Sequence, residues 1–144
     1  MRIVIQRVTQ ANVRVKDQDI GQINSGLVLL VGFSPTDSIQ TVQQMADKIS
    51  HLRIFADKSD KMNLDIKQVG GEVLIIPQFT LYGDLSGRRP GWQQAASPEL
   101  ANKLYQEFIK AIRTHQLKVQ TGQFGAHMQV ELINDGPVTF YLEN

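Results

Sequence analysis

The chain has 144 residues, of which 42% are hydrophobic and 20% charged, and its net charge is +1. These values predict one globular domain with a substantial core, 1–144, rather than a disordered or membrane protein. The chain has no cysteine, which excludes disulfides, thiolate metal sites and cysteine nucleophiles. Residues 1–15 lack the long apolar run of a signal peptide or membrane anchor, so we expect a cytoplasmic protein.

The first third of the chain predicts three strands joined by tight turns. Residues 1–15 end in an alternation of apolar and polar side chains that is typical of a half-buried strand. Residues 20–23 form a returning strand after a polar turn. Residues 27–33 are an unbroken apolar run, which indicates a strand covered on both faces.

Two segments have the spacing of amphipathic helices. Asp37 and Gln40 resemble a capping box, and apolar residues follow at helical spacing as far as Leu52. Ser97 and Pro98 have the residue types of an N-cap and a first helical position, and a second apolar stripe follows them. The charged segment 57–67 between these helices is expected to be a loop.

The segment 73–80 is the most informative stretch of the chain. Residues 73–76 predict a buried strand, and Pro77 is tolerated at an edge, a strand start or a bulge because it has no N–H. Gln78 and Thr80 lie two apart, which places them on one side of extended backbone. They are either a functional site at the strand end or the solvent-facing half of an edge strand, and the stretch by itself favours the second interpretation.

The C-terminal part adds further short strands, at Val119, at residues 128–132 and at residues 138–142. Asn134-Asp135-Gly136-Pro137 separates the last two, and an Asp-Gly pair between strands favours a hairpin turn. A Gly-Pro pair can instead direct two carbonyl groups into a site. The predicted fold is a strand-rich α+β domain with about seven strands and two long helices.

Familiar catalytic motifs are absent from the sequence. It has no Gly-x-Ser-x-Gly elbow, no phosphate-binding loop and no dinucleotide fingerprint. His51, His115 and His127 show no ligand spacing with one another or with nearby acids, so neither a metal site nor a cofactor is expected. An enzyme built from this chain would therefore work by positioning and by backbone hydrogen bonds.

Nucleic-acid binding would depend on local basic clusters, because the net charge is too small to act over long range. The alternative for such clusters is an ordinary solvated face. The candidates are Arg88, Arg89, Lys103, Lys110, Arg113 and Lys118.

Six short motifs, spread in order over almost the whole chain, resemble those of the D-aminoacyl-tRNA deacylase family. They are Gln6-Arg7-Val8, Lys61-Met62-Asn63, Gln78-Phe79-Thr80-Leu81, Arg89-Pro90, Gly122-x-Phe124-Gly125-Ala126-x-Met128 and Asn134-Asp135-Gly136-Pro137-Val138-Thr139.

This resemblance implies a metal-independent, homodimeric hydrolase. It would remove D-amino acids, and glycine from a wrong tRNA, at the 3′ end of aminoacyl-tRNA. It also implies a pseudo-barrel of mixed, mainly antiparallel strands flanked by two helices, with active sites at the dimer interface.

The resemblance also assigns roles to particular residues. Gln78, Phe79 and Thr80 would surround the scissile ester, and Gly136 and Pro137, joined by a cis bond, would reach across the interface to hold the α-amino group. Arg7 would hold that loop in place. The remaining substrate-binding residues would be Phe124, Gly125, Ala126 and Met128.

One departure from the family pattern concerns the site. The family usually has Ser before Gln-Phe-Thr, whereas this chain has Pro77, which removes a hydroxyl and a backbone donor. Two alternatives therefore stay open. One is a non-catalytic domain that binds the tRNA acceptor end, and the other is a related deacylase with a trans Gly-Pro bond that acts on some L-aminoacyl-tRNA.

Overall fold

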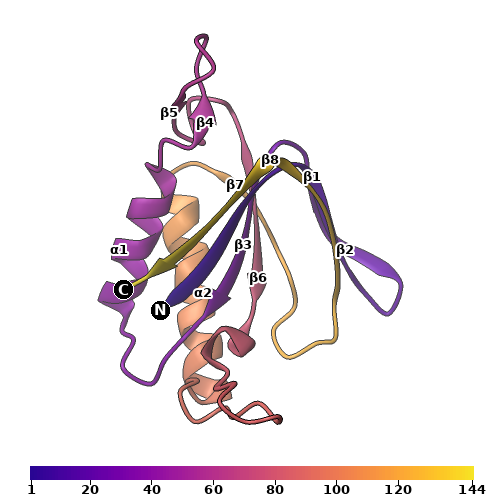
Figure 1. Cartoon of the computed structure of the whole chain (residues 1–144), viewed down its shortest axis with the longest axis vertical. Coiled ribbons are helices and arrows are strands. Elements are labelled where there is room, and N and C mark those ends of the chain that lie inside the picture. Colours follow the sequence, from indigo (N-terminus) through magenta and orange to yellow (C-terminus); the bar gives the residue numbers. More distant parts are fainter.

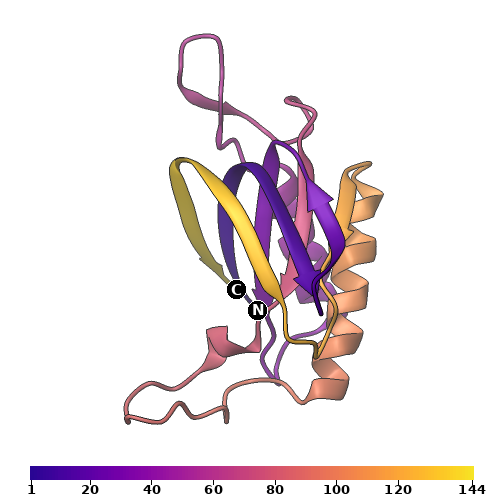
Figure 2. The same cartoon turned by 90° about the vertical axis from the view of Figure 1, so that its right-hand side faces the viewer.

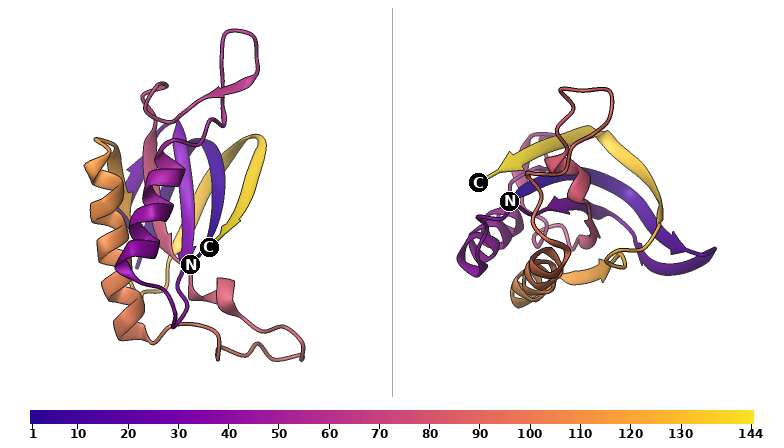
Figure 3. Two further views of the ribbon diagram at one scale, coloured as in Figure 1. Left: turned by 90° about the vertical axis from the view of Figure 1, so that its left-hand side faces the viewer. Right: turned by 90° about the horizontal axis from the view of Figure 1, so that it is seen from below.

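Figure 1 shows the computed structural model of the protein, which describes residues 1–144. A mixed six-stranded sheet curls around its own inner face, and two helices cover its outer face (Figures 1 and 3). The expected α+β pseudo-barrel with two long helices is therefore confirmed. No helix in the structure combines the length and the apolar character needed to cross a lipid bilayer.

The strand β1 (Arg2–Val15) is the hub of the sheet. Its first half pairs antiparallel with β3 (Gly26–Gly32), and its second half pairs with β2 (Gln18–Ile23). Its other edge pairs along most of its length with β8 (Gln129–Glu143). Figure 2 shows β8 bending over the sheet beside β1, which gives the sheet its curl.

The other half of the sheet is parallel. The strand β6 (Glu72–Pro77) lies between β3 and β7 (Lys118–Thr121) and runs parallel to both. An edge position for Pro77 is therefore wrong, because it ends a central strand and is aligned with Val31 of β3. The barrel nearly closes where β2 approaches β7: a Cβ atom on Gly21 would lie 3.2 Å from the carbonyl oxygen of Thr121.

Both faces of the sheet are buried, which explains the unbroken apolar run in β3. Leu27, Leu29 and Val31 point to the larger core, which lies under the helices. Val28 belongs to a smaller core inside the curled sheet. The other members of this inner core are Val8, Ala11, Val13, Ile23, Leu74 and Ile76.

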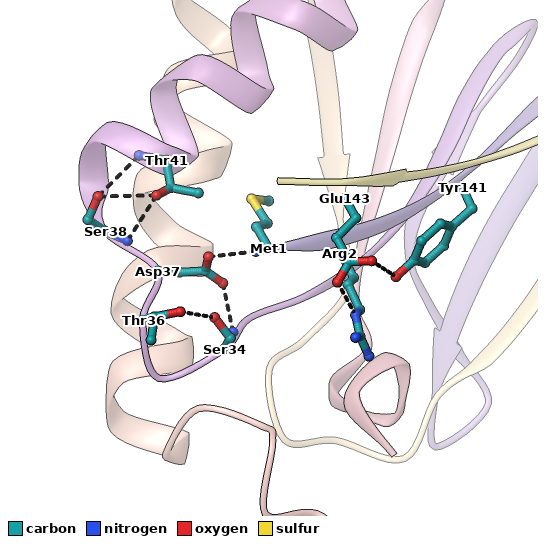
Figure 4. Close-up of polar contacts among 9 residues, drawn as sticks. All are labelled: Met1, Arg2, Ser34, Thr36, Asp37, Ser38, Thr41, Tyr141 and Glu143. Atoms are coloured by element: carbon teal, nitrogen blue, oxygen red, sulfur yellow. Dashed lines mark hydrogen bonds and ion pairs between the residues drawn. The ribbon is translucent and has the colours of Figure 1, made fainter. Parts of the chain in front are cut away.

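The helix α1 (Ile39–Ser50) begins one residue later than predicted, because its N-cap is Ser38 and not Asp37. Ser38 is the N-cap, and its hydroxyl accepts from the N–H of Thr41 while the Thr41 hydroxyl accepts from the N–H of Ser38 (Figure 4). Asp37 instead accepts from the amino group of Met1 and from the N–H of Ser34. The capping box predicted from Asp37 and Gln40 is therefore wrong, because a tertiary ion pair uses that carboxylate.

The helix α2 (Pro98–Thr114) begins as predicted, with Ser97 as N-cap and Pro98 in the first turn. Residues 57–67, however, are not wholly a loop. The short strands β4 (Phe55–Ala56) and β5 (Met62–Leu64) form a hairpin that includes the first part of this segment. The Asp57 carboxylate closes this hairpin by accepting from the N–H groups of Ser59 and Lys61, and these bonds lower the pKa of Asp57.

The predicted hairpin at residues 134–137 is also wrong. Both halves of β8 pair with the same partner strand, β1: Ile133 is aligned with Gln10 and Thr139 with Gln6. Residues 135–138 have no partner on β1 and form a bulged loop within one long strand.

Candidate active site

A cavity of about 700 Å³ opens where β3 and β6 end. The turn that follows β6, the N-terminal end of α2 and the turn after β7 form its other walls. The residues predicted for the site that line it are Gln78, Phe79, Phe124, Gly125, Ala126 and Met128.

The strand β6 runs directly into a 3₁₀ turn, η1 (Phe79–Tyr82), so Gln78 and Thr80 do not lie on extended backbone as predicted. Gln78 still continues the sheet for one bond, because its N–H donates to Val31 O at 2.7 Å. The turn then closes with the bond from Leu81 N–H to Gln78 O, at 3.2 Å. The Gln78 side chain donates to the Thr80 hydroxyl, which joins the two polar residues.

The first amide groups of η1 are free. The first N–H groups of a helical turn have no partner within the turn, and no hydrogen bond of the chain occupies those of Phe79 and Thr80. Arg2 fixes the turn from the other side. Its guanidinium donates to Leu81 O at 2.9 Å and lies 4.3 Å from the centre of the Tyr82 ring. Burial raises the pKa of Tyr82 to about 12, so that this ring stays neutral.

An aromatic pair forms the outer rim of the cavity. The rings of Phe79 and Trp92 meet at 65° with their centres 5.0 Å apart, although they are 56% and 42% exposed. Large apolar side chains this exposed at the mouth of a cavity are typical of a ligand-binding surface. Trp92 was not predicted as a site residue, because it lies fourteen residues after Gln78 in an irregular loop and only the fold brings its ring to the cavity.

The opposite wall is fixed by a buried tyrosine. Tyr105 of α2 donates its hydroxyl to Ile75 O at 2.8 Å, and Gly122 O also lies within hydrogen-bond distance, at 3.1 Å. Gly122 N–H in turn donates to Ile75 O at 2.8 Å. Burial raises the pKa of Tyr105 far above its ordinary value, so the hydroxyl remains a donor. This contact could not be predicted from the sequence, because Tyr105 fits the apolar stripe of α2.

No side chain that lines the cavity is ionisable at neutral pH. The cavity therefore has no carboxylate, histidine or lysine to act as a general base. Its polar features are the free N–H of Phe79, the amide of Gln78, the Ser97 hydroxyl and the N-terminal end of α2, which carries a partial positive charge. Thr80 does not line the cavity, although its hydroxyl contacts the Gln78 side chain. Such an arrangement can stabilise negative charge on a bound oxygen atom.

The loop at residues 134–139 is held from both sides. Asn134 closes it, because its side chain accepts from Val138 N–H at 2.7 Å and donates to Val138 O at 3.2 Å. Arg7 anchors it to the body of the protein, with its Nε 2.9 Å from an Asp135 carboxylate oxygen and its Nη1 donating to Ile54 O at 2.7 Å. The Gly136–Pro137 bond is cis, and both residues are exposed.

One subunit does not bring this loop to the cavity. Arg2 contacts η1 and Arg7 contacts the loop, and these residues lie five positions apart on the same strand. At about 3.3 Å per residue, the Cα atoms of the two arginines are about 16 Å apart, and no residue of the loop lines the cavity. Gly136, Pro137 and Arg7 are therefore gathered at one place, and Gln78 to Thr80 at another.

Comparisons with known proteins agree with the geometry. The family model described as D-Tyr-tRNA(Tyr) deacylase matches residues 4–143. The chain therefore belongs to the D-Tyr-tRNA(Tyr) deacylase family, and it is an enzyme, a hydrolase.

Individual relatives carry a broader name, which is not restricted to tyrosine. A D-aminoacyl-tRNA deacylase of Clostridioides difficile (strain 630) is 54% identical, and the alignment covers 100% of this chain and 97% of the relative. A D-aminoacyl-tRNA deacylase of Thermosipho africanus (strain TCF52B) is 50% identical, with the same coverage.

Two solved structures share the fold. One, described as a c-Myc DNA Unwinding Element Binding Protein, superposes with a TM-score of 0.94 and 38% identity, covering 100% of this chain and 99% of that one. The other, described as a probable eukaryotic D-amino acid tRNA deacylase, has a TM-score of 0.85 and 18% identity, covering 98% of this chain and 97% of that one. At that identity the likeness concerns the fold alone.

Proposed function

We propose that the protein hydrolyses the ester bond between a D-amino acid, or a mischarged glycine, and the 3′ end of tRNA. The observation that carries this proposal is the cavity at Gln78 and Phe79, directly before Thr80, which has a free N–H donor at Phe79 and no ionisable side chain. The names of the relatives support the substrate class. The roles proposed for individual residues are supported by the resemblance of the motifs and by the geometry of the cavity.

The chemistry requires little from the protein. An aminoacyl ester on ribose is already activated, and the adjacent 2′-hydroxyl of the tRNA aligns the attacking water. The N–H groups of Phe79 and Thr80 then stabilise the oxyanion, and such a donor is worth about 3 kcal/mol of transition-state stabilisation. Thr80 is not the nucleophile, because no base lies beside its hydroxyl and its partner is the Gln78 amide.

Chirality is enforced by a loop from a second subunit. Gly136 and Pro137 of the partner copy enter the cavity, where their carbonyl groups hold the α-amino group and leave no room for an L side chain. Glycine passes the same filter because it has only hydrogen at that position. The protein therefore acts as a homodimer with active sites at the interface. In support, Gly136 and Pro137 are exposed and do not line the cavity of their own subunit.

Two alternatives arise from the sequence, and observations weigh against both. A non-catalytic domain that binds the acceptor end conflicts with membership of a hydrolase family. The cis Gly136–Pro137 bond supports the proposed D-specific deacylase over a deacylase with a trans bond.

The decisive experiment compares D-tyrosyl-tRNA, L-tyrosyl-tRNA and glycyl-tRNA as substrates. We expect release of D-tyrosine and glycine and an intact L-ester, measured by acid-precipitable radiolabel over time. If all three esters stay intact, the protein binds aminoacyl-tRNA without hydrolysing it, and the proposal is wrong. The Thr80→Val variant separates the two mechanisms: it removes the hydroxyl but keeps the N–H, so we expect it to retain substantial activity, whereas a nucleophilic threonine predicts complete loss.

A further inference from the structure

The helices α1 and α2 lie side by side, and both end at the same end of the molecule (Figures 1 and 3). Pro98, at the start of α2, lines the cavity, whereas His115 caps the other end of that helix. At about 1.5 Å per residue, these 17 positions span about 26 Å. The region around the two helix ends is therefore remote from the candidate active site.

Both helices end in a histidine C-cap, His51 for α1 and His115 for α2. The side chain of Asp47 lies one turn before His51 on the same face of α1. One ligand atom from each of the three side chains can be chosen so that all lie within 4.8 Å of one another. The prediction that the histidines have no ligand spacing with nearby acids is therefore wrong. Asp47 and His51 are four residues apart on α1, and the fold brings His115 close to both.

The local hydrogen bonding prepares His51 to act as a ligand. Its Nδ1 lies 2.8 Å from the carbonyl oxygen of Asp47 and 3.4 Å from the carboxylate of the same residue. Since a carbonyl group accepts only, Nδ1 carries the proton in the neutral ring and the lone pair is on Nε2. A carbonyl that fixes the ring of a histidine in this way is typical of metal-ligating histidines.

The electric field at this place favours a cation. Each helix contributes a C-terminal end with a partial negative charge, and the two ends lie together. The Asp47 carboxylate adds a full negative charge. Lys48 and Arg113, in the last turns of the two helices, oppose it and limit the affinity.

We propose that Asp47, His51 and His115 form a binding site for a divalent transition-metal ion of the zinc type. Two imidazole nitrogens and one carboxylate oxygen match the ligand preference of Zn²⁺, and solvent supplies the fourth ligand. Ligand atoms around tetrahedral zinc lie about 3.4 Å apart. The cluster therefore closes by at most about 1.4 Å, which rotation of the exposed Asp47 side chain supplies while the bond to the Asp47 carbonyl holds the His51 ring.

The bound ion joins the ends of the two helices. It connects two elements that otherwise meet mainly through apolar packing, and it binds the folded chain only, since the ligands come from residues far apart in sequence. Metal binding therefore stabilises the fold by mass action. Because the site is about 26 Å from the cavity, the ion takes no part in the ester hydrolysis.

The test uses the full chain, first treated with a chelator and then titrated with Zn²⁺ by calorimetry and thermal unfolding. We expect one ion per chain and, at one hundred times the dissociation constant, a rise in the unfolding midpoint of about 8 °C. Mg²⁺ at the same concentration should cause no rise, because it prefers oxygen ligands.

The variants His115→Gln and Asp47→Asn should each weaken Zn²⁺ binding at least tenfold. His127→Gln is the matched control, because this third histidine lies outside the cluster, and it should bind Zn²⁺ as the unaltered chain does. Absence of binding, or equal binding by His115→Gln, would overturn the proposal. Circular dichroism confirms that each variant is folded. The deacylation assay is not a readout of this test, so the two proposals can fail separately.

Discussion

Gly136 occupies a position that no other residue can take without moving its neighbours. Its φ is +139°, and a Cβ atom there would lie 2.5 Å from Cγ2 of Val138 and 2.7 Å from the Val138 nitrogen. Real Cβ atoms essentially never approach backbone nitrogen so closely, so a side chain would displace the loop that Asn134 closes.

We therefore expect Gly136→Ala to reduce discrimination between D- and L-tyrosyl-tRNA by about tenfold or more. The measurement is the ratio of kcat/KM for the two substrates. Gly70→Ala is the matched control, because Gly70 also has a positive φ, +66°, but has no atom within 4 Å of its Cβ position. Gly70→Ala should lose about 1–2 kcal/mol of stability from its backbone conformation alone. Gly136→Ala should lose more, because of the contact with Val138, and only it should lose selectivity. Unchanged selectivity in Gly136→Ala would contradict the proposed role of the loop.

Pro77 is the second residue with a specific expectation. It lines the cavity directly before Gln78 and has no N–H. The Pro77→Ser variant adds a hydroxyl and a backbone donor at this wall, and one new hydrogen bond to the reacting ester is worth about threefold to tenfold in rate. We expect kcat for D-tyrosyl-tRNA to rise by that factor. Pro35→Ser, in an exposed loop, should leave kcat unchanged. Equal kcat values in the two variants would show that Pro77 has no effect on catalysis.

At the scale of elements, the sequence predicted what depends on local pattern. The apolar run of β3, the alternation in β1 and the Ser97-Pro98 start of α2 all lie where expected. Long-range contacts decided the rest: an ion pair with the Met1 amino group takes Asp37 away from the helix cap.

The site shows the same division between local and tertiary information. The motif at Gln78 was found from the sequence, but its 3₁₀ geometry was not, because propensity does not show where a strand turns into a helix. The His51–His115 pair and the contact of Tyr105 were also missed. Each of these joins the ends or faces of elements that are remote in sequence.

Tyr105 allows a test at this scale, because it connects α2, β6 and the turn after β7. The Tyr105→Phe variant removes a buried hydroxyl and leaves Gly122 O without that partner, so we expect a loss of about 1–2 kcal/mol in the free energy of unfolding. Tyr141→Phe is the control, since its hydroxyl bonds to Glu143 at the exposed surface and its loss should cost less than about 0.5 kcal/mol. Urea titration of both variants measures the difference.

At the scale of the whole molecule, the proposed shared site predicts a dimer, because the Gly136 loop does not line the cavity of its own subunit. We expect a mass of about 32 kDa by light scattering, twice the 16.2 kDa of one chain. A mass of 16 kDa at assay concentration with full activity would contradict the shared site.

Mixed dimers give a sharper version of this test. A Gly136→Ala subunit paired with a Phe79→Ala subunit contains one site in which both the loop and the cavity wall are unaltered. We expect selective activity to return on mixing the two inactive or unselective variants, with a yield set by random pairing. If each variant keeps its own defect after subunit exchange, the loop acts within its own subunit.

The pairing of β1 with β8 also sets the order of events as the protein is synthesised. The 14-residue hub of the sheet, β1, is synthesised well before β8, the partner for one of its edges. Until β8 emerges, the nascent chain carries an uncovered edge and an open inner core, both of which invite aggregation. We therefore expect the barrel to close only after β8 is made, so shortening β8 should lower the soluble yield more than it lowers the stability of the material that folds.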